Sequence, residues 1–167
     1  MKKFCLTITT AVFLLICLNG LQAQTTQTKL NQVELLKQFL GTWKSEIAKD
    51  TTIIGDYTPF GTAVESNLQI VTNNKILDSW KRFCGYDKIN DRLIIAKLMK
   101  SSPVIEISEF WFTSKNAGEG FVIQDISHPE NTTIKWKIEF KSPDLYIQTV
   151  IQNNKTIAVR IFNREKK

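Results

Sequence analysis

The chain has 167 residues and a formal net charge of +6 at pH 7, and 43% of its residues are hydrophobic. This length and composition suit one folded domain with a sizeable core. The positive charge is mild and scattered, and no arginine-rich run or alternation of basic and aromatic residues occurs, which argues against nucleic-acid-binding classes.

The first 23 residues have the pattern of a secretory signal peptide. Lys2 and Lys3 precede an apolar run over residues 4–18, and residues 21–23, Leu-Gln-Ala, form a small-residue exit. The apolar run is too short to cross a bilayer comfortably. We therefore expect cleavage after Ala23, a secreted or periplasmic location, and no membrane-spanning segment in the mature chain.

Cysteine positions bear on both processing and stability. A lipid anchor on Cys17 is the alternative to simple cleavage, and Ile16 argues against it because that processing requires a small residue there. Cleavage would leave Cys84 as the only cysteine, so the mature chain is expected to have no internal disulfide. No histidine lies near Cys84 in the sequence, which favours a small buried hydrophobe over a reactive thiol.

After a polar tail over residues 24–29, the sequence predicts a short helix. Asn31 and Glu34 fit a capping box at its start. Apolar residues then recur at spacings of three and four as far as Leu40. Gly41 can adopt the left-handed conformation that ends a helix, so Trp43 is expected to begin the first strand.

The rest of the sequence has a period of two. In the clearest segment, Ile134, Trp136, Ile138 and Phe140 alternate with lysine and glutamate, which predicts a strand with one face on a core. Short turns rich in Asn, Pro and Gly separate similar segments and imply consecutive antiparallel pairing. The expected strands lie near residues 42–48, 62–71, 75–84, 92–99, 104–113, 121–127, 133–140, 145–152 and 156–163.

An open meander of that many strands would leave two exposed edges, and closure removes both. We therefore predict a mainly β fold, with residues 30–167 forming a single antiparallel up-and-down β-barrel of about eight to ten strands behind a short N-terminal helix. The interior of such a barrel holds either packed side chains or a small ligand.

The order of these features resembles the lipocalin and fatty-acid-binding superfamily, and most closely its bacterial secreted lipocalin-like members. Residues 39–43 read FLGTW, residues 85–87 read Gly-Tyr-Asp, and Arg160 and Arg164 lie in the last predicted strand. The resemblance implies that Trp43 closes the narrow end of the barrel, with Arg160 or Arg164 stacked on its indole by a cation–π interaction. These residues and Gly41 are expected to be structural.

The aromatic content points to a ligand cavity. Cavities lined by aromatic rings with few polar groups are the usual sites for small molecules. The same rings could instead fill the core, and in EFWFT, residues 109–113, both strand faces are apolar, so alternation does not decide which of them points inward. The candidate ligand-binding residues are Tyr57, Trp80, Arg82, Trp111, Trp136 and Tyr146.

Two further predictions concern the direction in which segments face. Residues 49–61, KDTTIIGDYTPFG, resemble the lid-like loop of lipocalins, and their apolar residues are expected to pack on the barrel mouth or on an outer face. Asp78, Trp80 and Arg82 share one strand face, for which an exterior position with solvated charges is favoured. On an interior face, Asp78 and Arg82 would instead form a buried couple or an anchor for a carboxylate ligand.

The sequence supports three classes of function. The favoured one is an exported carrier for a small, mostly hydrophobic molecule; the alternatives are a barrel enzyme, such as an isomerase, cyclase or hydrolase, and a solid barrel that binds other proteins. No catalytic motif is recognisable, and the proton-handling candidates for an enzyme are Asp78, Glu109, His128 and Tyr146. With a single histidine in the chain, no metal site and no cofactor are expected.

Overall fold

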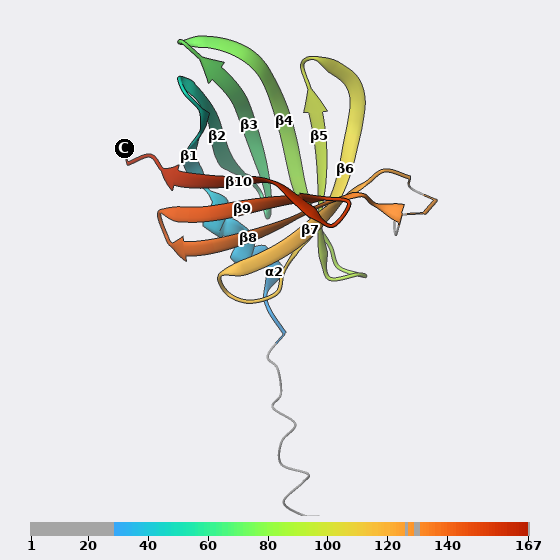
Figure 1. Cartoon of the computed structure of the whole chain (residues 1–167). Helices are drawn as coiled ribbons and strands as arrows, with labels where there is room; N and C mark the ends of the chain where they lie inside the picture. The colour runs from blue at the N-terminus through green and yellow to red at the C-terminus, as the bar shows by residue number, and fades with distance from the viewer. Residues whose placement is uncertain (1–28, 126, 129–130, 167) are drawn as a thin grey trace, which may run out of the picture.

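Ten β-strands follow a short N-terminal helix in the computed structural model (Figure 1), which describes residues 29–125, 127–128 and 131–166. The signal peptide predicted for residues 1–23 lies outside the described residues, as does the tail up to residue 28. Within the described ranges, no helix has the length and apolar character needed to cross a bilayer. The elements are α2 (Gln32–Leu36), the 3₁₀-helix η1 (Lys37–Phe39), β1 (Gly41–Ala48), β2 (Thr51–Phe60), β3 (Ala63–Thr72), β4 (Lys75–Asp87), β5 (Arg92–Met99), β6 (Ser102–Phe112), β7 (Ala117–Ile123), β8 (Ile134–Ser142), β9 (Leu145–Gln152) and β10 (Lys155–Arg164).

The strands form one closed antiparallel barrel. Each strand pairs with its neighbours in sequence, and β1 also pairs with β10, where Trp43 lies opposite Arg164 and Lys44 opposite Asn163. The predicted up-and-down barrel with a short N-terminal helix is therefore confirmed. Its ten strands are one more than the sequence pattern suggested.

The additional strand is the segment that was predicted to be a lid, and that prediction is wrong. β2 pairs with β3 along its whole length, from Thr51 opposite Thr72 to Phe60 opposite Ala63. Its apolar residues Ile53 and Tyr57 face the barrel interior, so they belong to the wall and do not cover a mouth. The glycine, aspartate and proline residues of β2 weaken the period-two pattern, but the pairing with β1 and β3 outweighs this local composition.

The helix closes one end of the barrel, called here the helix end. The Asn31 carboxamide oxygen accepts a hydrogen bond from the Glu34 amide at 3.1 Å, which confirms the first half of the predicted capping box. The buried Gln32 side chain donates to the Phe112 carbonyl at 3.1 Å and accepts from the Phe112 amide at 2.7 Å. Because a side-chain amide offers the same donor and acceptor as a neighbouring strand, these two bonds attach the helix to the end of β6.

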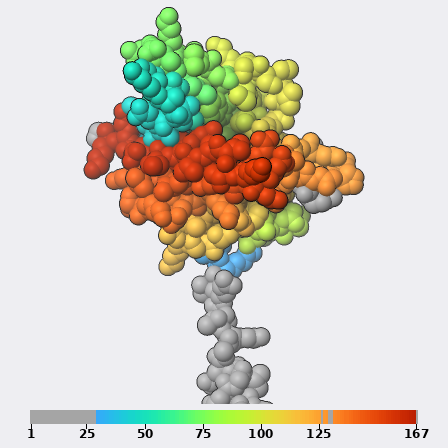
Figure 2. Space-filling model, viewed as in Figure 1, coloured from blue at the N-terminus to red at the C-terminus, as the bar shows by residue number. Residues whose placement is uncertain are grey.

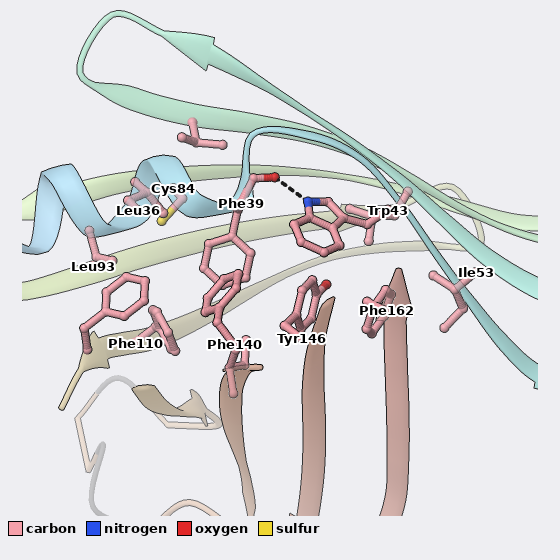
Figure 3. Packing of buried hydrophobic residues seen from close by; sticks show 14 residues of the cluster. Leu36, Phe39, Trp43, Ile53, Cys84, Leu93, Phe110, Phe140, Tyr146 and Phe162 are labelled. Atoms are coloured by element: carbon pink, nitrogen blue, oxygen red, sulfur yellow. Dashed lines mark hydrogen bonds between the residues drawn. The ribbon is translucent and has the colours of Figure 1, made fainter. Parts of the chain in front are cut away.

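Trp43 lies at the centre of the helix end, with 0% of its surface exposed. Its indole N–H donates to the Phe39 carbonyl at 2.7 Å (Figure 3). The Arg164 guanidinium carbon lies 4.2 Å from the centroid of the Trp43 ring, and the guanidinium also donates to the Leu40 carbonyl. Of the two arginines considered from the sequence, Arg164 makes this contact, and Arg160, four residues earlier in β10, lines the cavity inside the barrel.

Gly41 connects the helix to β1 in a conformation that other residues rarely adopt. Its φ is +110°, and a Cβ atom there would lie 2.8 Å from Arg164 Nη1. A side chain would therefore strain the backbone and displace the guanidinium that covers Trp43. Both the backbone conformation at this position and the close approach of Arg164 therefore favour glycine, which agrees with the structural role expected for Gly41.

An aromatic cluster fills the barrel next to the helix. The Phe39 ring lies at its centre, and Tyr146 at its edge stacks on Phe162 with ring centroids 4.6 Å apart. Figure 3 shows these rings packed beneath the indole of Trp43. The helix end is therefore solid, because aromatic rings at these separations pack closely. Five rings surround Phe39 at centroid distances of 5.1–6.2 Å: Tyr57, Phe110, Phe112, Phe140 and Tyr146.

The opposite end of the barrel, called here the far end, consists of turns that join each odd-numbered strand to the next strand. Alternation of strand direction puts the β1–β2, β3–β4, β5–β6, β7–β8 and β9–β10 connections at the strand ends that do not meet the helix. Figure 1 shows the first three of these turns on the side of the molecule away from α2.

Candidate ligand-binding cavity

A cavity of about 360 Å³ lies inside the barrel, beyond the aromatic cluster. It extends from Phe39 at the helix end to Ile157, which is 57% exposed at the far end, so it reaches the protein surface there. The volume falls within the range of roughly 300–1,000 Å³ that is usual for small-molecule sites. Most of the wall is apolar, and its aliphatic members include Ile53, Leu68, Ile95, Ile134, Ile138 and Val150.

Five of the six candidate ligand-binding residues line this cavity: Tyr57, Trp80, Arg82, Trp136 and Tyr146. Trp111 does not belong to the lining, because Phe110 and Phe112 are the inward residues of β6, each 2% exposed. The ring of Trp111 is instead covered by Arg92, whose guanidinium carbon lies 4.2 Å from its centroid. Phe110 and Phe112 both pack in the aromatic cluster at the helix end. This packing orients β6 so that the two phenylalanines of EFWFT point inward and Trp111 points outward.

Trp136 owes its position to a glycine on the neighbouring strand. Gly120 lies opposite Trp136 in the β7–β8 pairing, and a Cβ atom on it would be 2.7 Å from the indole Cζ2 atom. The absence of a side chain lets the indole lie against the β7 backbone. The strand expected near residues 121–127 in fact begins earlier, because β7 starts at Ala117 and includes both Gly118 and Gly120.

Arg82 projects into the cavity and bonds to neutral groups. Its Nη2 donates to the Tyr57 hydroxyl at 2.6 Å, and its Nε donates to Ser66 Oγ at 3.3 Å. The exterior position favoured for this face of β4 is therefore wrong. Asp78 is not the partner of Arg82, because its carboxylate accepts bonds from the Ser79 amide and the Ser101 hydroxyl near the far end.

A second arginine lines the same cavity. Arg160 Nη1 lies 3.4 Å from the Gln148 side-chain oxygen, and burial lowers the pKa of its guanidinium. Burial also raises the pKa of the neighbouring Tyr146 phenol well above its ordinary value, and Arg82 and Arg160 both act in the opposite direction. Both guanidinium groups therefore lie close enough to Tyr146 to act on one hydroxyl, which stays protonated at neutral pH.

The cavity has an excess of positive charge. Lys97 of β5 lies opposite Glu106 of β6, and its Nζ atom is 2.7 Å from Glu106 Oε1. The charges of these two residues therefore cancel. Within the described part of the chain, neither Arg82 nor Arg160 has a carboxylate partner. Both guanidinium groups are half-buried, and withdrawing a charge from water is costly unless it is paired, so together they form a site that favours an anion.

The other proton-handling candidates lie outside the cavity. Glu109 is on the same outward face of β6 as Trp111, and His128 is exposed in the connection between β7 and β8. Asp78 lies near the far end, where its bond to Ser101 lowers its pKa. Among residues 29–166, apart from the few not described, no group of three or more His, Cys, Asp or Glu side chains could hold a metal ion.

Cys84 is a buried cavity residue, and its chemistry gives a direct test of the packing. Burial raises the pKa of its thiol to about 12 from the ordinary 9.0. Because the thiolate is the reactive form, alkylation of Cys84 by iodoacetamide at pH 8 is expected to be about 1,000-fold slower than that of a free thiol. Mass spectrometry of the peptide that contains Cys84 measures this rate separately from the other cysteines. A rate equal to that of glutathione would contradict the buried position.

Several site residues were not identified from the sequence. Arg160 was considered only as a partner of Trp43, and Ser66, Lys97, Glu106 and Gln148 were not singled out. The sequence did contain one indication that Arg160 faces the interior. Arg160, Phe162 and Arg164 are spaced two residues apart, so all three lie on one face of the last strand. Only closure of the barrel shows that the first of these arginines lies beyond the aromatic cluster and the last lies on its outer side.

Comparisons with known proteins do not name a family for this chain. No model of a protein family matches it, and no curated protein matches it at a significant level. The resemblance to the lipocalin superfamily therefore stays a prediction. A closed barrel alone does not define an activity, because one fold hosts many functions.

Proposed function

We propose that the protein is an exported binding protein for a small, mostly hydrophobic molecule that carries one anionic group, such as a carboxylate. In this proposal the apolar part of the ligand occupies the aliphatic wall of the cavity, and the anion lies between Arg82 and Arg160. The observation that carries the proposal is the pair of arginines that line an apolar cavity without a carboxylate partner in the described chain.

Electrostatics favours an anionic ligand over a neutral one. Hydrogen bonds between ionised groups are roughly twice as strong as those between neutral groups, and a carboxylate can accept two parallel bonds from one guanidinium. The contacts of Arg82 with Tyr57 and Ser66 leave part of its fork available for such a bond. The Tyr146 hydroxyl, which stays protonated, adds a neutral polar group near both arginines. These groups together provide orientation, while the wall provides most of the contact area.

Binding is favoured over catalysis and over a purely structural barrel. Tyr146 is the one proton-handling candidate from the sequence that lines the cavity, and its raised pKa makes it a poor base at neutral pH. A cavity of about 360 Å³ also argues against a solid barrel that acts only through its outer surface. Export remains part of the proposal because of the signal peptide predicted for residues 1–23.

Native mass spectrometry of the protein purified from its own host tests this proposal. We expect a stoichiometric small molecule that organic solvent releases and that ionises as an anion. If the ligand exchanges during purification, the empty protein is expected to bind dodecanoate in isothermal titration calorimetry. A protein that is empty and also fails to bind dodecanoate would contradict the proposal.

A further inference from the structure

The turns at the far end share an irregularity that the cavity does not explain. In three adjacent hairpins the pairing register shifts beside the turn and leaves an extra residue without a partner on the opposite strand. The unpaired residues are Ile47 in β1, Leu77 in β4, and Val104 with its neighbour Pro103 in β6. A bulge needs only an extra residue, not an apolar one, so the repeated choice of a branched aliphatic side chain requires another cause.

These aliphatic side chains are in contact with solvent. Leu77 is 65% exposed and Val104 is 68% exposed, and their neighbours Ile76 and Ile105 are 61% and 55% exposed. Ile47 is 41% exposed. Single apolar residues on a surface are ordinary, but a set of them gathered on neighbouring hairpins marks a surface that contacts an apolar partner. We call Ile47, Ile76, Leu77, Val104 and Ile105, together with the lysines described next, the hairpin rim.

Each hairpin of the rim also carries a lysine at its turn: Lys49, Lys75 and Lys100. We counted charges in each hairpin over the two turn residues and the residue on either side of them. The three hairpins together contain these three lysines and one acidic residue, Asp50. The turns of the helix end, counted in the same way, contain as many acidic as basic residues. These three turns therefore carry a local excess of two positive charges beside the exposed aliphatic residues.

Hydrogen bonds join the three hairpins into one surface. The Asn73 amide donates to the Asp50 carbonyl at 3.2 Å, which ties the β3–β4 turn to the β1–β2 turn. The Lys100 amide donates to the Ser79 carbonyl at 2.8 Å, which ties the β5–β6 turn to β4. Figure 2 shows these segments, coloured cyan, green and yellow, forming the part of the molecule that lies beyond β10 and away from the helix.

The β9–β10 hairpin repeats the pattern at the mouth of the cavity. Its bulge leaves Ile157 unpaired, and Lys155 stands at the turn. The bulge beside the β8–β9 turn, at the helix end, instead leaves Lys141 unpaired, and that lysine bonds to Glu139 at 2.5 Å. The combination of an exposed aliphatic bulge with a turn lysine therefore occurs in four of the five far-end connections, and in none of the helix-end turns among the described residues.

We propose that the hairpin rim docks on a lipid bilayer with anionic head groups. The aliphatic bulge residues would enter the boundary between head groups and acyl chains, and the turn lysines would contact the phosphates. Peripheral proteins combine apolar side chains with lysines in this way, because each contribution alone gives only marginal binding. The proposal does not depend on which ligand the cavity holds.

Vesicle co-sedimentation of the full chain tests this proposal. The rim variant combines Lys75→Gln, Leu77→Ser, Lys100→Gln and Val104→Ser. Against vesicles made of equal parts phosphatidylglycerol and phosphatidylcholine, we expect its affinity to fall on the order of 100-fold relative to the unchanged protein. Added salt is expected to weaken binding of the unchanged protein, because it screens the lysines.

A matched variant at the helix end removes the same kinds of group. It combines Phe60→Ser, Lys88→Gln, Ile89→Ser and Lys115→Gln, where Phe60 is 65% and Ile89 is 94% exposed. This control is expected to bind as the unchanged protein does. All proteins in the experiment carry the same residues 1–28, so binding through that segment cannot produce a difference between variants. Thermal unfolding of each variant shows that the comparison is made between folded proteins.

Three outcomes would overturn the proposal. The first is a folded rim variant that binds anionic vesicles as tightly as the unchanged protein. The second is equal binding to vesicles of pure phosphatidylcholine, which would exclude a role for the lysines. The third is a dimer, detected by light scattering without vesicle binding, that the rim variant converts to a monomer, because the rim would then join two copies of the chain.

Discussion

Replacing Trp43 with alanine is expected to lower the free energy of unfolding by about 3–5 kcal/mol, the range found for large aromatic residues in cores. The Trp43 ring is fully buried and contacts the rings of Tyr146 and Phe140 at centroid distances of 4.7 and 6.3 Å. Alanine would leave a void among these rings and remove the surface on which Arg164 stacks. Denaturant unfolding followed by circular dichroism measures the loss.

Trp111 provides a matched control for this substitution. It has the same contact with an arginine, since the Arg92 guanidinium carbon also lies 4.2 Å from the ring centroid, but it is on the outer face of the barrel and only partly buried. Trp111→Ala is therefore expected to cost about 1 kcal/mol, the value of a surface cation–π contact. Equal losses at the two positions would show that burial in the helix end is not what makes Trp43 important.

Replacing Arg82 and Arg160 together with methionine is expected to weaken the binding of dodecanoate by roughly two orders of magnitude or more, because hydrogen bonds to charged groups contribute about 1.5–3 kcal/mol each. Methionine keeps an unbranched apolar side chain in the wall, so the apolar contacts with the ligand are retained. Isothermal titration calorimetry with the unchanged protein and with each single variant measures how much each arginine contributes.

Two controls separate the loss of charge from a general loss of binding. Dodecan-1-ol has the same chain without the carboxylate, and the double variant is expected to bind it as well as the unchanged protein does. Arg92→Met removes a guanidinium from the outer face, where it covers Trp111, and is expected to leave dodecanoate binding unchanged. If the double variant binds dodecanoate as tightly as the unchanged protein, Arg82 and Arg160 do not hold the anion.

Local sequence patterns correctly predicted which side chains of a strand face the core where one face of the strand is apolar and the other is polar. β8 is the clearest example, since Trp136, Ile138 and Phe140 face the interior as predicted and the intervening Lys137 and Glu139 are exposed. The same patterns failed in two ways. β2 was missed because glycine, aspartate and proline interrupt its alternation, and β6 could not be oriented because Phe110, Trp111 and Phe112 are all apolar.

The candidate site was predictable in its residue types but not in its arrangement. Tyr57, Trp80, Arg82, Trp136 and Tyr146 were singled out from the sequence and all line the cavity. The face of β4 that carries Arg82 was nevertheless expected to be exterior, because a charged residue on a strand is usually solvated. The sequence contained no sign that Tyr57 and Ser66, from two other strands, would satisfy its donors.

Local sequence is enough to predict one short helix followed by antiparallel strands, because caps, turns and period-two alternation depend on residues that are close in the chain. It does not predict that Arg164 covers Trp43 while Arg160 enters the cavity, or that Arg82 faces Tyr57. These contacts join strands that are distant in sequence, and barrel closure sets their register. The charge of the cavity is thus a property of the closed barrel, since it depends on which side chains meet across the interior.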